Sequence, residues 1–473
     1  MFMDDMGWGD LGIYGNPASE TPNLDRLAEE GIKFTDMYTG SSICSPSRAS
    51  LLSGRLPIRN GFYSDGQFAR ASYAPQVVLG ENGYQNKIVG KWHLGHRERY
   101  LPLNHGFHEW FGAPNCHYKY DTTVQPNIPV YKNREMTGRY YQDYKIDHKT
   151  GLGNLTQLYT QEALEFIERK TKQNENFFLY WAPDATHTPL YASKEFRGKS
   201  KRGLYGDAIM EIDAGVGKIM ALLKKLDIDK NTFVFFSSDN GAATYAFTNG
   251  GSNGPFLCGK QTTFEGGYRQ PALARFPGKI PAGQITNQVS LLMDLLPTIL
   301  DFADIKMPRN LTLDGQSIRN VMEGTSKVYD RGVFYYRGNA LFKSRYGFYK
   351  AHFYTWNTPA EAIKIGYHYC PGQRIENVTT SQMTNYTDKP LLFHLGRDPG
   401  EKFPIDPTTE EYRIGLAPIL KIVQQHKDKL IKAKPEFNLC DLAIQNWAPR
   451  GCEKINRCMK APPSYVYKCF WPY

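Results

Sequence analysis

Over roughly its first 300 residues the chain alternates short apolar runs with longer amphipathic stretches, a rhythm typical of a sheet flanked by helices. The apolar runs predict strands at 86–90, 177–182, 232–237 and 272–276. The amphipathic stretches predict helices at 21–30, 157–170 and 205–226. We therefore expect an α/β fold in which helices cover a large sheet.

The pattern changes at about residue 330, where short aromatic strands and turns begin, such as 333–337 and 349–356. This change predicts a catalytic domain at 1–329 and a smaller antiparallel α+β domain at 330–432. The last segment, 433–473, holds four of the eight cysteines and five prolines, and it has little apolar material for a core. It is expected to be a meander held by disulfides, since histidines of zinc-finger type do not accompany its cysteines.

Charge and processing signals point to the secretory pathway. The net charge of +10 favours acidic partners such as sulfated glycans, although a merely basic surface would explain it equally well. The sequence predicts no nucleic-acid module and no membrane span. No signal peptide precedes the first aspartates, which alone would indicate the cytosol. The tail cysteines and four N-x-Thr glycosylation acceptors indicate secretion instead, so we expect that the natural start lies elsewhere; the acceptors are Asn154, Asn310, Asn377 and Asn385.

Two pairs of oxygen ligands lie at or near the ends of predicted strands. Asp4 and Asp5 form the first pair, and Asp239 and Asn240 form the second. In an open α/β sheet the carboxyl ends of strands form the ligand-binding edge. Several carboxylate and amide oxygens at one point suit a hard divalent cation, calcium before magnesium. Either pair alone is more often a turn or a helix cap.

Between these pairs lies Cys44-Ser45-Pro46-Ser47-Arg48, whose C-x-P-S-R spacing matches the signature of the sulfatase family. In that family the cysteine is oxidised to formylglycine during secretion. The hydrated aldehyde carries two hydroxyls on one carbon. One attacks sulfur with metal activation, and the other loses its proton and expels sulfate. The alternative interpretation of Cys44 is a buried structural cysteine.

A second motif, GKWHLG at 90–95, matches the second sulfatase signature. Lys91 and His93 are two apart on an extended segment and so face the same side. The lysine can bind sulfate oxygens, and the histidine can act as a base. His187 can protonate the departing sugar oxygen, and Lys260 can hold the sulfate or the leaving oxygen. The H-x-x-H spacing of His93 and His96 lacks the further ligands that zinc needs.

The motifs occur in the order found in sulfatases, and the chain resembles a vertebrate sulfatase over nearly its whole length. Segments outside the signatures also match, at 56–63, 251–267, 393–401 and 446–453. The resemblance implies an alkaline-phosphatase-like fold with a large mixed sheet. It also implies a lysosomal homodimer, made active by the formylglycine-generating enzyme. Such an enzyme removes 6-sulfate from N-acetylgalactosamine in chondroitin 6-sulfate and from galactose in keratan sulfate, at the non-reducing end.

The resemblance also implies roles for individual residues. The calcium ligands would be modified Cys44 together with Asp4, Asp5, Asp239 and Asn240. Arg48 would stabilise the hydrated aldehyde, Lys91 would bind sulfate, and His93 would assist turnover of the sulfated intermediate. His187 and Lys260 would serve the leaving group, and Tyr73 would touch substrate. Cys116 would stay unpaired beside the implied disulfides Cys258–Cys370, Cys440–Cys469 and Cys452–Cys458.

Two departures from the family keep alternatives open. Only Met1-Phe2-Met3 remain of an apolar first strand, and only 76–82 stand where the family has a longer stretch with a helix. Losing both would expose apolar surface and cost more than a domain's stability of about 5–15 kcal/mol. An incomplete gene model or a splice form would explain this, and an inactive chain that only binds sulfated glycans is one alternative. A phosphatase or phosphodiesterase of the same fold is another, but those enzymes use serine or threonine where this chain has C-x-P-S-R.

Overall fold

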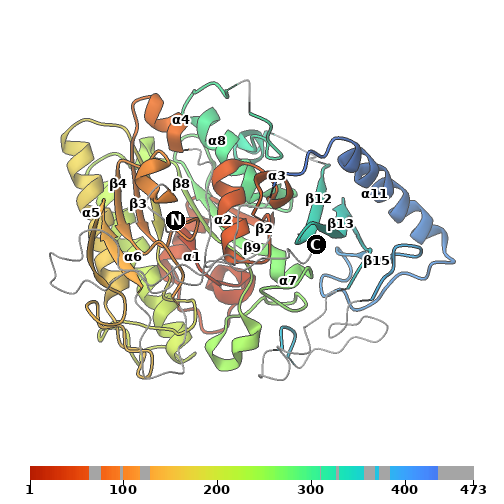
Figure 1. Ribbon diagram of the computed structural model, residues 1–473, viewed down its shortest axis with the longest axis horizontal. Helices are drawn as coiled ribbons and strands as arrows, with labels where there is room; N and C mark the ends of the chain where they lie inside the picture. The colour runs from red at the N-terminus through yellow and green to blue at the C-terminus, as the bar shows by residue number, and fades with distance from the viewer. Residues whose placement is uncertain are drawn as a thin grey trace.

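The computed structural model describes residues 1–62, 76–95, 100–117, 128–308, 311–325, 330–355, 368–371 and 384–434. Two mixed sheets and their helices form a large body, and a four-stranded antiparallel sheet with one long helix lies beside it (Figure 1). The predicted α/β fold class is confirmed. Among the described residues, no helix has the length and apolar character that a membrane crossing requires.

The first sheet carries the strand that ends at the first aspartate pair. Its strands, in spatial order, are β1 (Phe2–Met3), β8 (Val234–Ser238), β9 (Arg269–Arg275), β2 (Ile32–Tyr38) and β10 (Gln284–Thr286), with β11 (Ser290–Leu291) also on β2. β1 runs parallel to β8, whereas β9 is antiparallel to both of its neighbours. All seven residues of β9 are buried, because the strand lies inside the sheet.

The second sheet positions the second sulfatase motif. Its strands, in spatial order, are β6 (Glu135–Arg139), β5 (Pro129–Lys132), β4 (Glu109–Gly112), β3 (Gln85–Gly90) and β7 (Phe177–Ala182). β3 is parallel to both β4 and β7. Gly90 ends β3 with φ +105°, and a Cβ there would lie 2.1 Å from the carbonyl oxygen of Ala182. Only glycine permits this close approach, which delivers Lys91 to the edge of the sheet.

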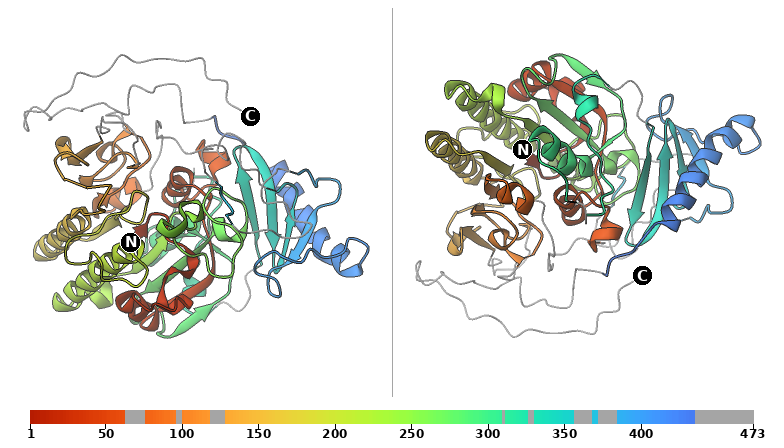
Figure 2. Two further views of the ribbon diagram at one scale, coloured as in Figure 1. Left: turned by 90° about the horizontal axis from the view of Figure 1, so that it is seen from below. Right: turned by 90° about the horizontal axis from the view of Figure 1, so that it is seen from above.

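Three helices cover one face of the body side by side (Figure 2). They are α1 (Pro22–Glu29), α5 (Leu155–Lys172) and α6 (Leu204–Lys225). The apolar residues of α6 recur at helical spacing and are buried, as the sequence predicts: Ile209, Ile212, Val216, Ile219 and Leu223. The predicted helices 21–30, 157–170 and 205–226 thus end within two residues of the observed ones.

The C-terminal sheet is antiparallel, as predicted, with the order β12 (Gly332–Arg337), β13 (Ala340–Tyr346), β14 (Tyr349–His352) and β15 (Leu391–His394). The strand expected at 349–356 ends at His352. Helix α11 (Glu410–Asp428) lies across this sheet (Figure 1), and the strand-and-turn pattern did not predict it. Its buried residues Tyr412, Leu416, Ile419 and Val423 have the helical spacing that could have revealed it.

Two short elements lie where the sequence differs from the family pattern. β1 pairs with β8 through Phe2 and Met3, and the backbone of Met1 adds hydrogen bonds to Phe235 and Ser237 of the same strand. A cavity of about 400 Å³ with mostly apolar walls adjoins Met1, and residues of β7 and β8 line it. A short helix, α4 (Gln76–Glu81), stands where the sequence predicted the loss of a helix. That expectation is corrected: a six-residue helix is present there.

Candidate active site

Four strands end at one buried site, and each delivers the polar residues expected from the sequence. Asp4 and Asp5 follow β1, and Asp239 and Asn240 follow the parallel strand β8. The segments after β3 and β7 deliver the rest, namely Lys91, His93 and His187. Within each sheet the parallel pair, β1 with β8 and β3 with β7, brings its carboxyl ends to one edge. Contacts between β1 and β7 bring these two edges together, although the segments are far apart in sequence.

Helix α2 (Cys44–Ser53) brings the signature into the site. Cys44 begins the helix and Arg48 lies one turn later, so both side chains share one face. The Sγ of Cys44 lies 3.5 Å from Oδ1 of Asp4 and 3.9 Å from Oδ1 of Asp5. Arg48 donates from Nη2 to Oδ2 of Asp239 over 2.8 Å and from Nε to the same oxygen over 3.0 Å. A helix start also directs its positive dipole end towards an anion at this point.

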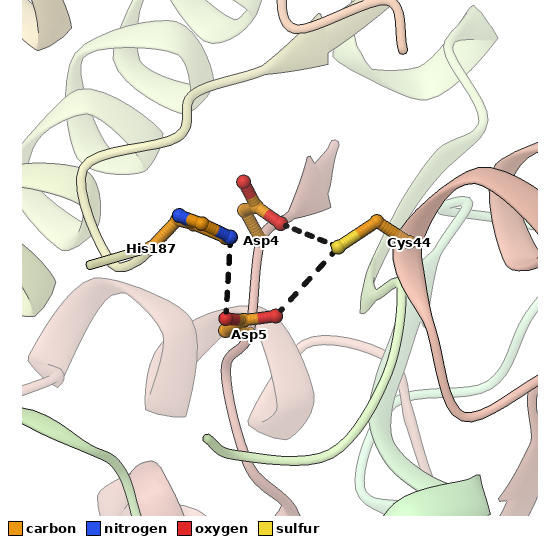
Figure 3. Close-up of side chains that lie close together, drawn as sticks. All are labelled: Asp4, Asp5, Cys44 and His187. Atoms are coloured by element: carbon orange, nitrogen blue, oxygen red, sulfur yellow. Dashed lines mark hydrogen bonds and ion pairs between the residues drawn. The ribbon is translucent and has the colours of Figure 1, made fainter. Parts of the chain in front are cut away.

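The donor set fits a divalent cation. Figure 3 shows Cys44 and His187 on opposite sides of Asp4 and Asp5, with all four side chains directed at one another. Their ligand atoms lie within 4.8 Å of one another. Asn240 donates from Nδ2 to Asp5, while its buried Oδ1 has no hydrogen-bond partner in the described part of the chain. An orphaned amide oxygen beside two carboxylates is a ligand arrangement for a hard ion.

Three cations neutralise the three carboxylates. Lys91 Nζ lies 2.7 Å from Asp4, Lys260 Nζ lies 2.7 Å from Asp5, and Arg48 binds Asp239. The carboxyl oxygens and the two ammonium groups are buried to at least 97%. The site therefore holds three fixed cationic groups, and each of them is already paired with a carboxylate.

Lys260 lies in a loop that a disulfide ties to the C-terminal part of the chain. Cys258 is bonded to Cys370, which is the pairing that the resemblance implied. Cys116 is a free, buried cysteine, also as implied. Because Cys258 is two residues from Lys260, the disulfide restrains the backbone that carries this lysine.

The pKa values of the three carboxyl groups, Asp4, Asp5 and Asp239, are shifted in different directions. Burial alone would raise the pKa of Asp4, but the charge of Lys91 holds it well below its ordinary value. Burial raises the pKa of Asp5 despite Lys260, and it raises the pKa of Asp239 to about 7 despite Arg48. A bound cation would favour the ionised form of all three.

The unmodified thiol is a poor nucleophile in this environment. Burial, together with the charge of Asp239, raises the pKa of Cys44 well above its ordinary value. The thiolate is the reactive form of a cysteine, so this shift disfavours the reactive form of an unmodified Cys44. The chemistry of the site therefore fits an oxidised Cys44 better than a thiol.

The two histidines differ in their contacts. Both ring nitrogens of His93 are buried without a hydrogen-bond partner among the described residues, and its φ is +59°. His187 places Nδ1 2.8 Å from the carbonyl oxygen of Thr188, and its Nε2 lies 3.8 Å from Oδ2 of Asp5. Burial lowers the pKa of both, aided by Lys91 for His93 and by Lys260 for His187.

Sequence reasoning assigned no role in the site to a neighbouring group that contacts His187: Cys116, His117 and Asp184. The Sγ of Cys116 lies 3.2 Å from Nε2 of His187 and 3.4 Å from Nζ of Lys91. Asp184 follows β7 by two residues, so the rule about polar residues at strand ends could have singled it out.

Several predicted residues lie outside the described part of the chain. They are Tyr73, His96, Asn310, Asn377 and the tail cysteines Cys440, Cys452, Cys458 and Cys469. Two of the four glycosylation acceptors, Asn154 and Asn385, are described and exposed.

Comparison with known proteins places this geometry in context. Residues 1–305 match the family model described as sulfatase, and residues 329–460 match the C-terminal region of aryl-sulfatase. The chain is 54% identical to N-acetylgalactosamine-6-sulfatase of Rattus norvegicus and 52% identical to that of Homo sapiens. Each alignment covers 100% of this chain and 93% of the relative. Among solved structures, the PsFucS1 sulfatase from Pseudoalteromonas sp. superposes with a TM-score of 0.77 at 27% identity, covering 90% of this chain and 89% of that one.

Proposed function

Since the chain belongs to the sulfatase family and is a sulfuric ester hydrolase, we propose that it removes 6-sulfate groups from glycosaminoglycan ends. The proposed substrates are N-acetylgalactosamine 6-sulfate in chondroitin 6-sulfate and galactose 6-sulfate in keratan sulfate. The name of the rat and human relatives supports the first substrate. The observation that carries the proposal is the buried convergence of Cys44, Asp4 and Asp5 with three fixed cations.

We propose Ca²⁺ as the metal, held by Cys44 after conversion and by Asp4, Asp5, Asp239 and Asn240. When bound, the ion would polarise the sulfate oxygens and acidify a hydroxyl at position 44. We propose that the formylglycine-generating enzyme converts Cys44. A hydrated aldehyde supplies the nucleophilic hydroxyl that the thiol cannot.

The surrounding side chains then divide the remaining work. Lys91 and Lys260 would bind the sulfate oxygens, since each ammonium already faces the centre of the site. Arg48 would stabilise the hydrated residue 44, and His93 would accept the proton released when sulfate leaves. His187 would donate a proton from Nε2 to the sugar oxygen. The negative charge of a bound sulfate ester raises the pKa of this imidazole and so favours the protonated form that the step requires.

Further parts of the proposal concern the chain as a whole. We propose the three parts 1–329, 330–432 and 433–473 as domains, a lysosomal location and a homodimer. We also propose that Tyr73 contacts the sugar. The lysosome, whose pH is acidic, suits a mechanism that begins with a protonated histidine.

The test is sulfate release at about pH 5 from 6-sulfated N-acetylgalactosamine and galactose substrates. The chain is expressed behind a signal peptide with the formylglycine-generating enzyme, and Cys44→Ala is the matched control. We expect sulfate release that the control lacks, because the substitution removes the nucleophile and leaves the fold intact. A folded, secreted chain without this activity would instead support the alternative of a protein that only binds sulfated glycans.

A further inference from the structure

His187, the residue proposed as the acid, has its backbone carbonyl hydrogen-bonded to a second, fully buried histidine. We propose that His117, anchored by Asp184, is a positioning residue that directs His187 towards the leaving oxygen. This inference rests on the proposed role of His187. His117 lies behind the loop of His187 and is 0% exposed, so we assign it no contact with the substrate.

The contacts of His117 clamp the backbone on both sides of the His187–Pro189 turn. Its Nε2 lies 3.0 Å from the carbonyl oxygen of His187 and 3.2 Å from that of Pro189. Carbonyl oxygens only accept, so Nε2 must carry the hydrogen and donate it to them. The two imidazoles also meet edge to face, with ring centroids 5.1 Å apart.

The other ring nitrogen fixes the orientation of His117. Its Nδ1 lies 3.1 Å from Oδ2 of Asp184, and the hydroxyl of Tyr140 lies 3.1 Å from the same nitrogen. The ring of Tyr140 stacks on the imidazole at 4.9 Å. Tyr191 donates to the remaining oxygen of Asp184 over 2.8 Å. All these side chains are buried, so their contacts restrain the imidazole in one orientation.

Asp184 also closes the turn that carries His187. Its carbonyl oxygen accepts from the backbone N–H of His187 over 3.0 Å, while its carboxyl group holds His117. One residue therefore restrains the turn through its backbone and through its side chain. A change at His117 would free the His187 carbonyl without removing any group that touches the substrate.

The consequence for His187 is a defined direction of its reactive nitrogen. Its Nδ1 faces the carbonyl oxygen of Thr188 in the clamped turn and donates to it. Its Nε2 consequently points into the site towards Asp5 and Cys116. Proton transfer depends steeply on such placement, because a misplacement of about 1 Å can cost about 100-fold in rate.

Two amide substitutions test whether the hydrogen bonds from His117 to the backbone of the His187–Pro189 turn matter, or only the packing of its side chain. In His117→Gln the amide nitrogen reaches about as far as Nε2 and can still donate to the carbonyl of His187. In His117→Asn the amide reaches only as far as Nδ1, so it can contact Asp184 but not the carbonyl. The readout is the ratio of kcat on a 6-sulfated sugar to kcat on 4-nitrophenyl sulfate. The aryl leaving group departs readily without a proton, whereas the sugar oxygen needs one.

We expect His117→Asn to lower this ratio about tenfold or more, and His117→Gln to keep it within about threefold of the parent. The control is His426→Phe, a buried histidine on α11, which should leave the ratio unchanged. Equal losses on both substrates, or equal ratios in the two amide variants and the parent, would overturn the proposal. Should His117→Asn fail to fold, Asp184→Asn carries the same expectation.

The variant His187→Ala distinguishes this inference from the proposed function. If it lowers the ratio strongly while His117→Asn does not, the acid role stands and the positioning role is wrong. If His187→Ala itself leaves the ratio unchanged, the acid role of His187 is wrong, and the positioning role of His117 is refuted with it. Absence of Cys44-dependent activity in the parent would refute the proposed function independently of both.

Discussion

Replacing Lys350 with methionine should cost the protein much of its stability, because this lysine joins the two main parts of the structure. It lies on β14 with its side chain 0% exposed. Its Nζ lies 2.7 Å from Glu265, on the catalytic body, and 3.0 Å from Glu401. Burial alone would raise the pKa of these carboxyl groups. The nearby cations, Lys350 first, instead hold the pKa of Glu265 well below its ordinary value and that of Glu401 at about 2.

The magnitude follows from what remains after the substitution. Lys350→Met leaves two ionised, buried carboxylates without the ammonium group between them. Arg269 still binds Glu265 over 2.8 Å, and His352 still contacts Glu401 over 2.6 Å, so neither carboxylate loses every partner. Removing one partner of a buried ion pair typically costs about 3–5 kcal/mol, and we expect a loss in free energy of unfolding within that range.

The same sheet offers a matched control in Lys343. It lies on β13, is also 0% exposed, and its Nζ has no hydrogen-bond partner among the described residues. The Nζ lies 3.3 Å from the centroid of the Phe264 ring, and burial lowers its pKa well below the ordinary value. Lys343→Met removes an unsatisfied buried amine, so it should change the free energy of unfolding by less than about 1 kcal/mol or stabilise the protein.

The assay is denaturant-induced unfolding of the parent, the two single variants and Lys350→Met with Glu401→Gln. The double variant should recover at least about 1 kcal/mol, because the uncompensated charge is removed. The reasoning is refuted if Lys350→Met costs less than about 1 kcal/mol, or if Lys343→Met costs as much as Lys350→Met.

Three further predictions concern pH, the disulfide and the metal. Burial lowers the pKa of His426 to about 4 from the ordinary 6.5. As pH falls, the unfolded chain therefore binds this proton before the native state does, and the native state loses stability below about pH 7. His426→Phe removes this loss, so its deficit in free energy of unfolding relative to the parent should shrink by about 2 kcal/mol between pH 7 and 5 in unfolding experiments. Replacing both Cys258 and Cys370 by serine removes a disulfide that spans 112 residues, and it should lower the free energy of unfolding by about 5 kcal/mol. It should also lower kcat, because the loop of Lys260 is no longer restrained. An unchanged unfolding midpoint would contradict this prediction. Chelation of the metal should abolish activity and lower the unfolding midpoint, and added Ca²⁺ should restore both. The bound ion should stabilise the native state by about 4 kcal/mol at an ion concentration 1,000 times Kd. An unfolding midpoint that does not respond to the chelator would argue against a resident ion.

The sequence by itself determined the elements whose cause is local. The strand at 177–182 and the helix at 205–226 follow from apolar periodicity, and the observed bounds agree within one residue. The proximity of Cys44 and Arg48 follows from helical spacing alone. The convergence of the Asp4 and Asp239 segments was also predictable, because parallel strands share a carboxyl edge.

Other features depended on partners that no local pattern identifies. The sequence could not place β9 antiparallel between β8 and β2, since strand pairing is selected by packing across the whole sheet. It did not predict the Lys350 cluster, whose partners lie 85 and 51 residues away along the chain.

The hydrogen bonds from His117 to the turn of His187 are the clearest example of a feature that the sequence could not predict. His117 and Asp184 are 67 residues apart, and although Asp184 follows a strand end, nothing in the sequence pairs it with His117. Only the tertiary structure turns both ring nitrogens of His117 towards fixed partners. A buried polar group must be satisfied by whatever the fold brings next to it, and that neighbour is decided by packing rather than by sequence spacing.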